Sequence, residues 1–227
     1  MQYENILKKL KTLSNPKAVE GMARFGINPK STYGVSVPNL RRIAKEIGRD
    51  RPLAQQLWDS GIHEACILAS MIDDPNQVTK KQMDAWIRDF DSWDVCDQCC
   101  MNLFDKTPMA WEKAVEWTKR EKEFEKRAGF ALMACLAWHN KEAPDKKFLT
   151  LLLAIKREAD DDRNYVKKAV NWALRNIGKR NVNLNRKAIE TAKEVQKIES
   201  KSAKWIASDA IRELTSEAVQ ERLQKKR

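Results

Sequence analysis

Glycine, proline and histidine are scarce in this chain of 227 residues, which contains seven glycines, seven prolines and two histidines. The sequence contains no glycine-rich phosphate loop, no nucleophile elbow and no paired-histidine metal motif. These absences exclude P-loop enzymes, Rossmann dehydrogenases and zinc hydrolases. They leave chemistry that relies on carboxylates, arginine and aromatic side chains.

Long hydrophobic runs are also missing. The most apolar run, 148–155, is followed at once by Lys156 and Arg157 and is far shorter than the roughly 18 residues of a membrane span. The first residues lack the continuous apolar region of a secretory signal. The five cysteines are odd in number and lie within apolar helical patterns. We therefore expect a soluble, cytoplasmic protein with reduced thiols and no membrane partner.

The balance of charge is strongly basic. Lysine and arginine number 43 against 32 acidic residues, which gives a net charge of +11 and an isoelectric point near 9.4. Such a balance favours a polyanionic partner, and nucleic acid is the first candidate. Charge alone is equally compatible with a basic protein that has no such partner, because the total says nothing about clustering.

Apolar residues recur at three- and four-residue spacing along the whole chain, which predicts an all-α fold. The more apolar helices begin at intervals of about 31 to 40 residues, a period typical of HEAT-like helical hairpins. We predict an α-α superhelix of about six antiparallel hairpins, forming one curved domain over residues 1–227 with a concave basic groove. The apolar helices are expected at 62–72, 93–105, 124–138, 164–178 and 201–214, and their more charged partners at 52–59, 79–90, 108–120, 145–158 and 185–198.

The most unusual segment is DFDSWDVCDQCC at 89–100. If Ser92 caps a helix, Trp93 and Asp97 are one turn apart and project to the same side, and Asp94 lies in the positive first turn. A carboxylate would then lie beside an indole. The alternative is structural: Asp94 caps the helix, Trp93 packs in the core and Asp97 is solvated.

A second set of candidates lies in the predicted helix 164–178. Lys168, Trp172 and Arg175 fall at i, i+4 and i+7 and form a stripe of cation, aromatic and cation. Arg127 lies near the start of another apolar helix. Cations with aromatics between them can grip a phosphate backbone and stack on bases. Tryptophan at helical spacing is more often core, which is what we predict for Trp58, Trp86, Trp111, Trp117, Trp138 and Trp205.

Cys96 and Cys99 have the C-x-x-C spacing of a metal site. With Cys100 they occupy positions i, i+3 and i+4 of an apolar helix, and no second ligand pair follows. We therefore expect these thiols to face the core, and we expect neither a metal nor a cofactor.

The chain resembles the AlkD-type bacterial DNA glycosylases, the DNA alkylation repair family built from HEAT-like repeats. The resemblance rests on the order and spacing of MARFGI at 22–27, SWDVCD at 92–97, EKRAGFAL at 125–132 and YVKKAVNWALR at 165–175. It implies that Trp93, Asp97 and Trp172 line the cleft against the damaged nucleotide. It further implies that Phe25 replaces an expected tyrosine near the DNA backbone. The residues expected to contact DNA are Arg24, Phe25, Arg127, Lys168 and Arg175.

The implied activity is base-excision repair of double-stranded DNA that contains alkylated bases. Hydrolysis of an N-glycosidic bond passes through an oxocarbenium-like sugar, which the Asp97 carboxylate would stabilise while it orients water. A purine alkylated at N3 or N7 is cationic and leaves without a general acid. Trp93 and Trp172 would hold the lesion by cation–π contact. The resemblance also implies recognition through the backbone with the base still stacked.

Two other functions remain open at this stage. One is a non-catalytic protein that binds DNA or structured RNA, and the other is a protein-interaction scaffold, which is common among helical repeats. A scaffold needs no carboxylate among cations, so the joint presence of Trp93, Asp97, Arg127 and Trp172 favours a monofunctional glycosylase. We expect the protein to be a monomer.

Overall fold

A computed structural model describes residues 2–225, and these residues contain helices and no strand. The all-α prediction is confirmed. No helix in this part of the chain combines the length and the apolar character that crossing a membrane requires. The chain divides into two compact units, Met1–Pro108 and Met109–Arg227, which are described in turn. That they act as one repeat domain stays a prediction.

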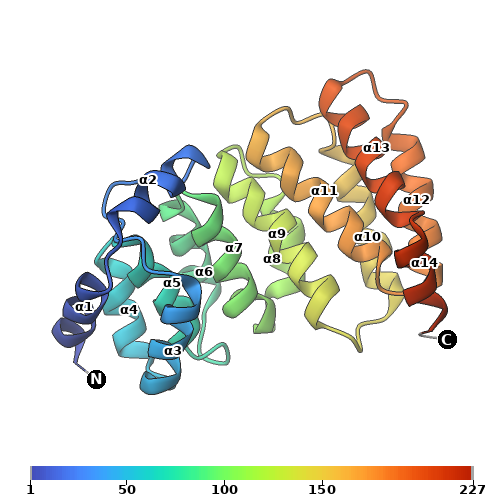
Figure 1. The fold of residues 1–227 in the computed structure, drawn as a ribbon. Coiled ribbons are helices and arrows are strands. Elements are labelled where there is room, and N and C mark those ends of the chain that lie inside the picture. Colours follow the sequence, from blue (N-terminus) through green and yellow to red (C-terminus); the bar gives the residue numbers. More distant parts are fainter. Residues whose placement is uncertain (1, 226–227) are drawn as a thin grey trace. The chain divides into compact units, whose positions relative to one another are not determined.

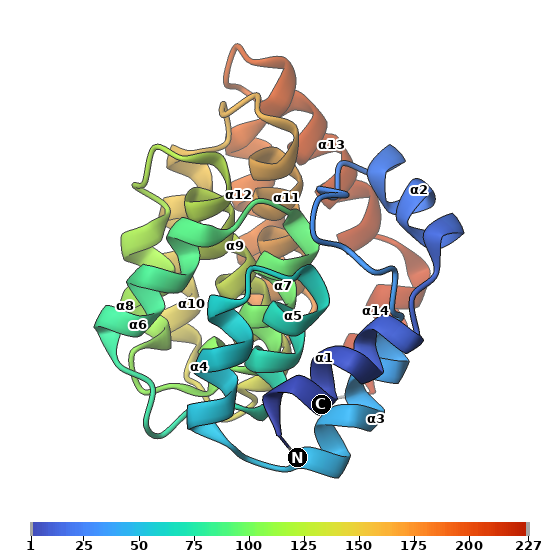
Figure 2. The ribbon, with the colours of Figure 1, turned by 90° about the vertical axis from the view of Figure 1, so that its left-hand side faces the viewer.

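The first unit is built around a hairpin of two helices, α4 and α5, which contact each other along their length. Helices α1 and α3 pack on α5 from one side and α7 packs on it from the other (Figure 1 and Figure 2). The elements are α1 (Tyr3–Thr12), α2 (Pro16–Arg24), α3 (Val37–Ile47), α4 (Arg51–Asp59), α5 (His63–Ile72), α6 (Lys80–Trp86), η1 (Ile87–Asp89), α7 (Trp93–Asn102) and η2 (Phe104–Lys106).

The second unit stacks three hairpins, α8 with α9, α10 with α11 and α12 with α13. Helix α11 contacts both α9 and α13, so these three helices form one row, and α10 and α12 contact each other in a second row (Figure 1). The elements are α8 (Ala110–Trp117), α9 (Glu123–His139), α10 (Asp145–Arg157), α11 (Asn164–Gly178), α12 (Val182–Val195), α13 (Lys201–Leu214) and α14 (Glu217–Gln224).

Local sequence signals set several of these helix starts. Asn15, Asp50 and Asn181 each accept a hydrogen bond from the backbone N–H three residues ahead, as N-cap residues do. Proline follows in the first turn of α2 and α4, where its missing N–H costs nothing. The five predicted apolar helices correspond to α5, α7, α9, α11 and α13, with ends displaced by at most a few residues.

One glycine sets the packing distance within the first hairpin of the second unit. A Cβ at Gly129 of α9 would lie 2.7 Å from the Thr118 backbone nitrogen and 3.0 Å from the Ala114 carbonyl oxygen. Any side chain there would push α8 and α9 apart. Around this contact, α9 is almost wholly buried from Ala128 to Ala137.

Candidate nucleic-acid interface

Helix α7 begins where the sequence predicts, with Ser92 in the N-cap position. The Ser92 hydroxyl does not bond to an N–H of its own helix. Instead it accepts the Asn28 backbone N–H at 3.2 Å and donates to Asp91 Oδ1 at 2.9 Å. Asn28 also donates its side-chain N–H to Asp91 Oδ2 at 2.6 Å. These bonds fix the chain segment that follows α2 against the turn before α7.

Trp93 and Asp97 lie one turn apart on α7, and both side chains are partly buried. The Trp93 indole N–H donates to the Phe25 carbonyl oxygen at 3.0 Å. Phe25 itself is 73% exposed, and the neighbouring Arg24, the last residue of α2, is exposed as well. The first unit therefore brings together Arg24, Phe25 and Trp93, with Asp97 one turn further along α7. Their roles toward DNA stay predictions.

Asp94 has a partner that the sequence analysis missed. Its carboxylate lies in the first turn of α7, as predicted, and its Oδ2 is 2.9 Å from His63 Nε2. Burial, the largest influence, acts to lower the pKa of His63. The hydrogen bond and charge of Asp94, with the charges of Glu64 and Asp91, raise the pKa above its ordinary value of 6.5. His63 thus joins the first turn of α5 to the first turn of α7.

We expect His63→Gln to destabilise the protein more in mild acid than in mild base. A raised pKa means that the folded protein binds the proton more tightly than the unfolded chain, so this stabilisation is present below the unfolded pKa and is lost as the pH rises through the folded pKa. The difference in unfolding free energy between wild type and variant should be larger at about pH 5.5 than at about pH 8.5, by roughly 1 kcal/mol. Urea denaturation at both pH values measures it, and an equal loss at both would contradict the ion pair.

A cavity of about 480 Å³ adjoins His63 in the first unit. Three carboxylates line it, those of Asp59, Asp89 and Asp91. Val95 also lines it, and because Val95 lies about 200° around α7 from Trp93, the cavity adjoins the helix face opposite Trp93 and Asp97. The candidate site on α7 is therefore a surface, separate from this acidic cavity.

The cysteines of the first unit are structural. Cys96, Cys99 and Cys100 are fully buried, as predicted, and each is a free thiol. Burial, followed by the charges of nearby aspartates, raises the pKa of Cys66 to about 12, and burial also raises the pKa of Cys99. Such thiols stay protonated at neutral pH and are poor nucleophiles. Across residues 2–225, no three His, Cys, Asp or Glu side chains are grouped to hold a metal ion.

The predicted stripe on α11 lies in the second unit. Lys168 is exposed and Trp172 is partly buried one turn later. Arg175 is bonded through Nη1 to Glu213, and the same atom lies 3.6 Å from Asp209. Two acidic side chains of α13 therefore already balance part of the charge that this arginine would offer to DNA.

Arg127 is more buried than a phosphate contact would suggest. Its side chain lies in the first half of α9, only 6% of the residue is exposed, and Nη1 donates to the Tyr165 carbonyl oxygen at 2.7 Å. This bond joins α9 to the first turn of α11. The predicted contact of Arg127 with DNA is not tested by this arrangement and stays a prediction.

The prediction that six further tryptophans are core residues is partly wrong. Trp58, Trp86 and Trp117 are buried, and the rings of Trp58 and Trp86 stack with centroids 3.9 Å apart. Trp138 and Trp205 are instead 57% and 42% exposed. For Trp138 the reason is its position at the end of α9, where nearly every preceding residue is buried and no periodic pattern indicates the exposed side.

Charge is distributed unequally between the units. Residues 1–108 contain nearly equal numbers of acidic and basic side chains, so almost all of the net charge of +11 belongs to the second unit. Electrostatic attraction to a polyanion would therefore act mainly through the second unit.

One family profile matches most of the chain, and several proteins are similar to it over most of their length. The profile of the family described as DNA alkylation repair enzyme matches residues 6–214. The uncharacterized protein Lin0241 of Listeria innocua is 23% identical over 200 residues, which cover 86% of this chain and 87% of that protein. The uncharacterized protein Lmo0209 of Listeria monocytogenes is 22% identical over the same length, with the same coverage.

A solved structure has a similar fold. It is described as belonging to a new family of proteins related to the HEAT-like repeat DNA glycosylases with affinity for branched DNA structures. Its TM-score is 0.79 at 22% sequence identity, and the match covers 93% of this chain and 95% of that one. The HEAT-like fold class predicted from the sequence is confirmed. Because the family profile spans most of its length, the chain belongs to the DNA alkylation repair enzyme family.

Proposed function

We propose that this protein is a monofunctional DNA glycosylase that removes cationic N3- and N7-alkylpurines from double-stranded DNA. The observation that carries the proposal is the pairing of Trp93 with Asp97 on one partly exposed face of α7, in a chain of the DNA alkylation repair enzyme family. A carboxylate one turn from an indole on a partly exposed helix face suits the positive charge that develops on a sugar.

The chemistry requires little more than a fixed negative charge. As the N-glycosidic bond breaks, positive charge develops on the sugar, and the Asp97 carboxylate would stabilise that charge and orient the attacking water. The alkylated purine leaves as a neutral base because it begins as a cation, so no general acid is needed. Trp93 would contact the lesion or its sugar through its π face. No cofactor takes part in this proposal.

The second unit would supply most of the electrostatic contacts with the DNA backbone. Lys168 is the most exposed member of the α11 stripe, with Trp172 one turn away, and both lie in the unit that carries nearly all of the net charge. Arg175 would share its charge between phosphate and the α13 carboxylates, and Arg127 would act from beneath the surface. Contacts of this kind hold the backbone without extrusion of the base. In this proposal the protein acts as a monomer in the cytoplasm.

Base release is the direct test of this proposal. Purified protein is incubated with duplex DNA that contains 7-methylguanine, and the supernatant is analysed for free base while the DNA is probed for abasic sites. We expect release of 7-methylguanine in equal amount to the abasic sites formed, and no release of unmodified guanine. Absence of both products under conditions where the protein binds the duplex would refute the glycosylase.

A second function is favoured by one specific comparison, the solved structure described as having affinity for branched DNA. We propose as the alternative that this chain binds branched DNA without releasing bases. Competition between a four-way junction and a linear duplex of equal length distinguishes the two. Preference for the junction together with no base release supports the alternative, whereas equal affinity with base release supports the glycosylase.

A further inference from the structure

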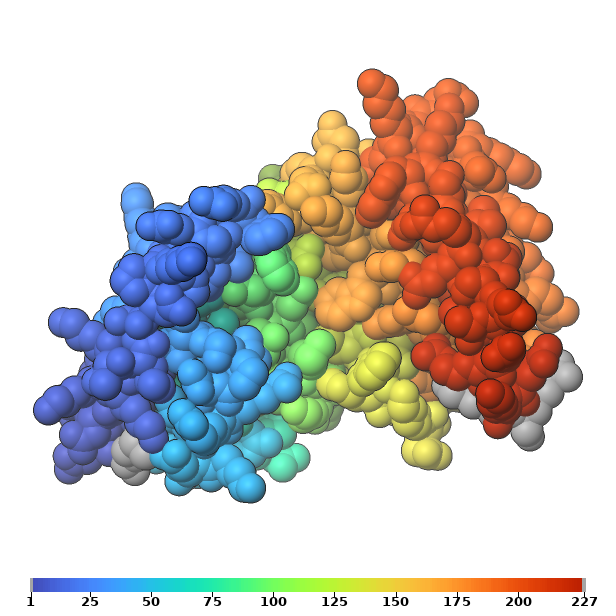
Figure 3. All heavy atoms as spheres, viewed as in Figure 1, coloured from blue at the N-terminus to red at the C-terminus, as the bar shows by residue number. Residues whose placement is uncertain are grey.

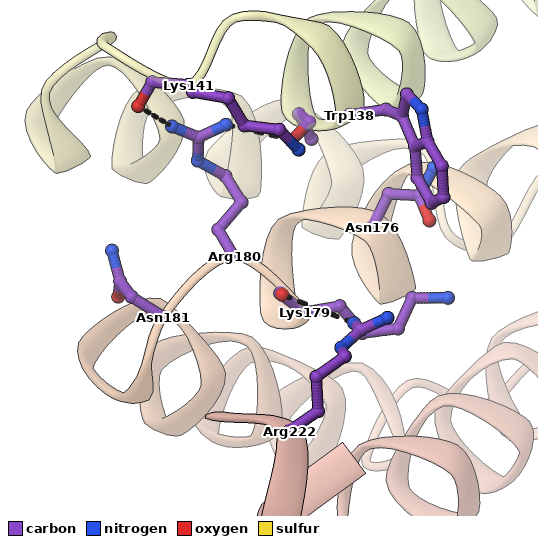
Figure 4. A pocket seen from close by; sticks show the side chains of 8 residues that line it. Trp138, Lys141, Asn176, Lys179, Arg180, Asn181 and Arg222 are labelled. Atoms are coloured by element: carbon purple, nitrogen blue, oxygen red, sulfur yellow. Dashed lines mark hydrogen bonds between the residues drawn. The ribbon is translucent and has the colours of Figure 1, made fainter. Parts of the chain in front are cut away.

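A basic pocket in the second unit lies at the C-terminal end of α11, beyond the stripe of Lys168, Trp172 and Arg175. It has a volume of about 630 Å³ and is bordered by the ends of α9 and α11 and by α14. Figure 4 shows Lys141 and Trp138 entering from the α9 side, Arg222 entering from α14, and Arg180 in the wall between them. In Figure 3 the yellow end of α9 and the red α14 are neighbours on the visible face.

Two of the four cationic side chains that line this pocket, Lys179 and Arg180, form hydrogen bonds to other parts of the protein. Lys179 donates to Glu213 at 2.6 Å, and because Glu213 also pairs with Arg175, the charge of Lys179 is balanced in part. The Arg180 guanidinium donates to the carbonyl oxygens of Ala137 and Lys141 at 2.8 and 3.1 Å. Arg180 thus closes the end of α9 and contributes a fixed positive charge to the wall.

The other two cations, Lys141 and Arg222, are exposed. Arg222 makes one long hydrogen bond, of 3.4 Å, to the Lys179 carbonyl oxygen. Burial, followed by the positive charges of Arg180 and Arg222, lowers the pKa of Lys141. The mutual repulsion of these three charges would be relieved by an anion placed between them.

An aromatic face lies beside this charge. Trp138 is 57% exposed, and Lys141 Nζ lies 5.5 Å from the centroid of its ring. Asn176, nearly buried in the same wall, presents an amide to the pocket (Figure 4). An exposed indole next to cations is the arrangement with which proteins stack a nucleic-acid base and hold its phosphate. The pocket volume is ample for one nucleotide.

We propose that this pocket binds an unpaired segment of single-stranded nucleic acid, with one base stacked on Trp138 and its phosphate between Lys141 and Arg222. A paired base inside a duplex has no face available for Trp138, so the pocket selects a frayed, displaced or single strand. An acidic peptide would satisfy the cations but leave the indole without a flat partner. The inference rests on the proposed role in DNA binding, and it does not depend on base release.

The test measures binding of a fluorescein-labelled oligonucleotide of twelve thymidines by anisotropy. We expect Trp138→Ala to weaken binding about tenfold or more, because base stacking is lost. Lys141→Gln with Arg222→Gln should reduce the slope of log K against log salt by about 0.7, the value for one phosphate contact on a single strand. The matched control is Lys146→Gln with Lys197→Gln, which removes two exposed charges of α10 and of the turn after α12.

Three outcomes would overturn the proposal. Trp138→Ala could bind the oligonucleotide within twofold of wild type, the control pair could reduce the salt slope as much as the pocket pair, or a poly-glutamate peptide could displace the oligonucleotide as well as unlabelled thymidine oligomer does. Because Trp138 is exposed, its truncation leaves the core intact, and a thermal melt verifies this. The probe carries no alkylated base, so failure here is distinct from failure of the glycosylase.

Discussion

Asp97→Asn is expected to slow the release of 7-methylguanine by a factor of about 10² to 10³ under single-turnover conditions with excess enzyme. Asparagine has nearly the same shape as aspartate and keeps a carbonyl oxygen, but it carries no negative charge. Stabilisation of the sugar cation is therefore lost while packing on α7 is retained. The measured quantity is the first-order rate of base release at saturating protein.

Binding should not weaken with this substitution. In the proposed complex Asp97 lies close to phosphate, so removal of its negative charge should leave the affinity for unmodified duplex unchanged or slightly higher. The control variant is Asp59→Asn, which neutralises an exposed carboxylate at the end of α4 whose Oδ1 accepts a hydrogen bond from Gln55. It should release base at the wild-type rate. Wild-type release by Asp97→Asn would mean that the carboxylate has no part in the reaction.

The sequence predicted the helices well because their signals are local. Apolar spacing along 164–178 acts within a few residues of the helix that it specifies, so the bounds of α11 match the prediction. The same holds for the placement of Trp93 and Asp97 on one face of α7, since one turn of helix separates them. The start of α12 was predicted at 185 but lies at Val182, because the prediction did not include Asn181 as the N-cap.

Contacts between distant segments were not predictable in the same way. His63 and Asp94 are hydrogen-bonded, but no sequence pattern around either residue indicates the other as its partner. The exposure of Trp138 was missed because α9 is buried on nearly all sides before it, which removes the periodicity that would identify an outward position. The basic pocket was not predicted either, because Lys141, Arg180 and Arg222 come from three separate helix ends.

Glu64→Ala is expected to lower the free energy of unfolding by about 3 to 4 kcal/mol. Glu64 is 1% exposed, and its carboxylate accepts the backbone N–H groups of Tyr33 at 2.9 Å, Gly34 at 2.6 Å and Val35 at 3.1 Å. Truncation leaves these donors without their acceptor inside the first unit. Urea denaturation followed by circular dichroism measures the loss.

The turn that Glu64 holds cannot easily rearrange to find other acceptors. Gly34 has a φ of +77°, and a Cβ there would lie 2.4 Å from the Asn15 carbonyl oxygen, so the backbone is fixed against the start of α2. The same segment leads back to Phe25, whose carbonyl oxygen accepts the Trp93 indole N–H. Glu64→Ala should therefore also disturb the surroundings of Trp93, visible as a change in tryptophan fluorescence under native conditions.

Comparison of three variants separates the charge of Glu64 from its geometry. Glu64→Gln keeps one carbonyl oxygen for the three donors, so it should lower the free energy of unfolding by less than Glu64→Ala does. It should still lower it, because hydrogen bonds to a charged acceptor are stronger than those to a neutral one. Glu46→Ala removes an exposed carboxylate paired with Lys9 and should cost less than about 1 kcal/mol. If Glu64→Ala lowered the free energy of unfolding by no more than Glu46→Ala, the buried carboxylate would not be what fixes the turn at residues 33–35. The position of Phe25 beside Trp93 would then have another cause.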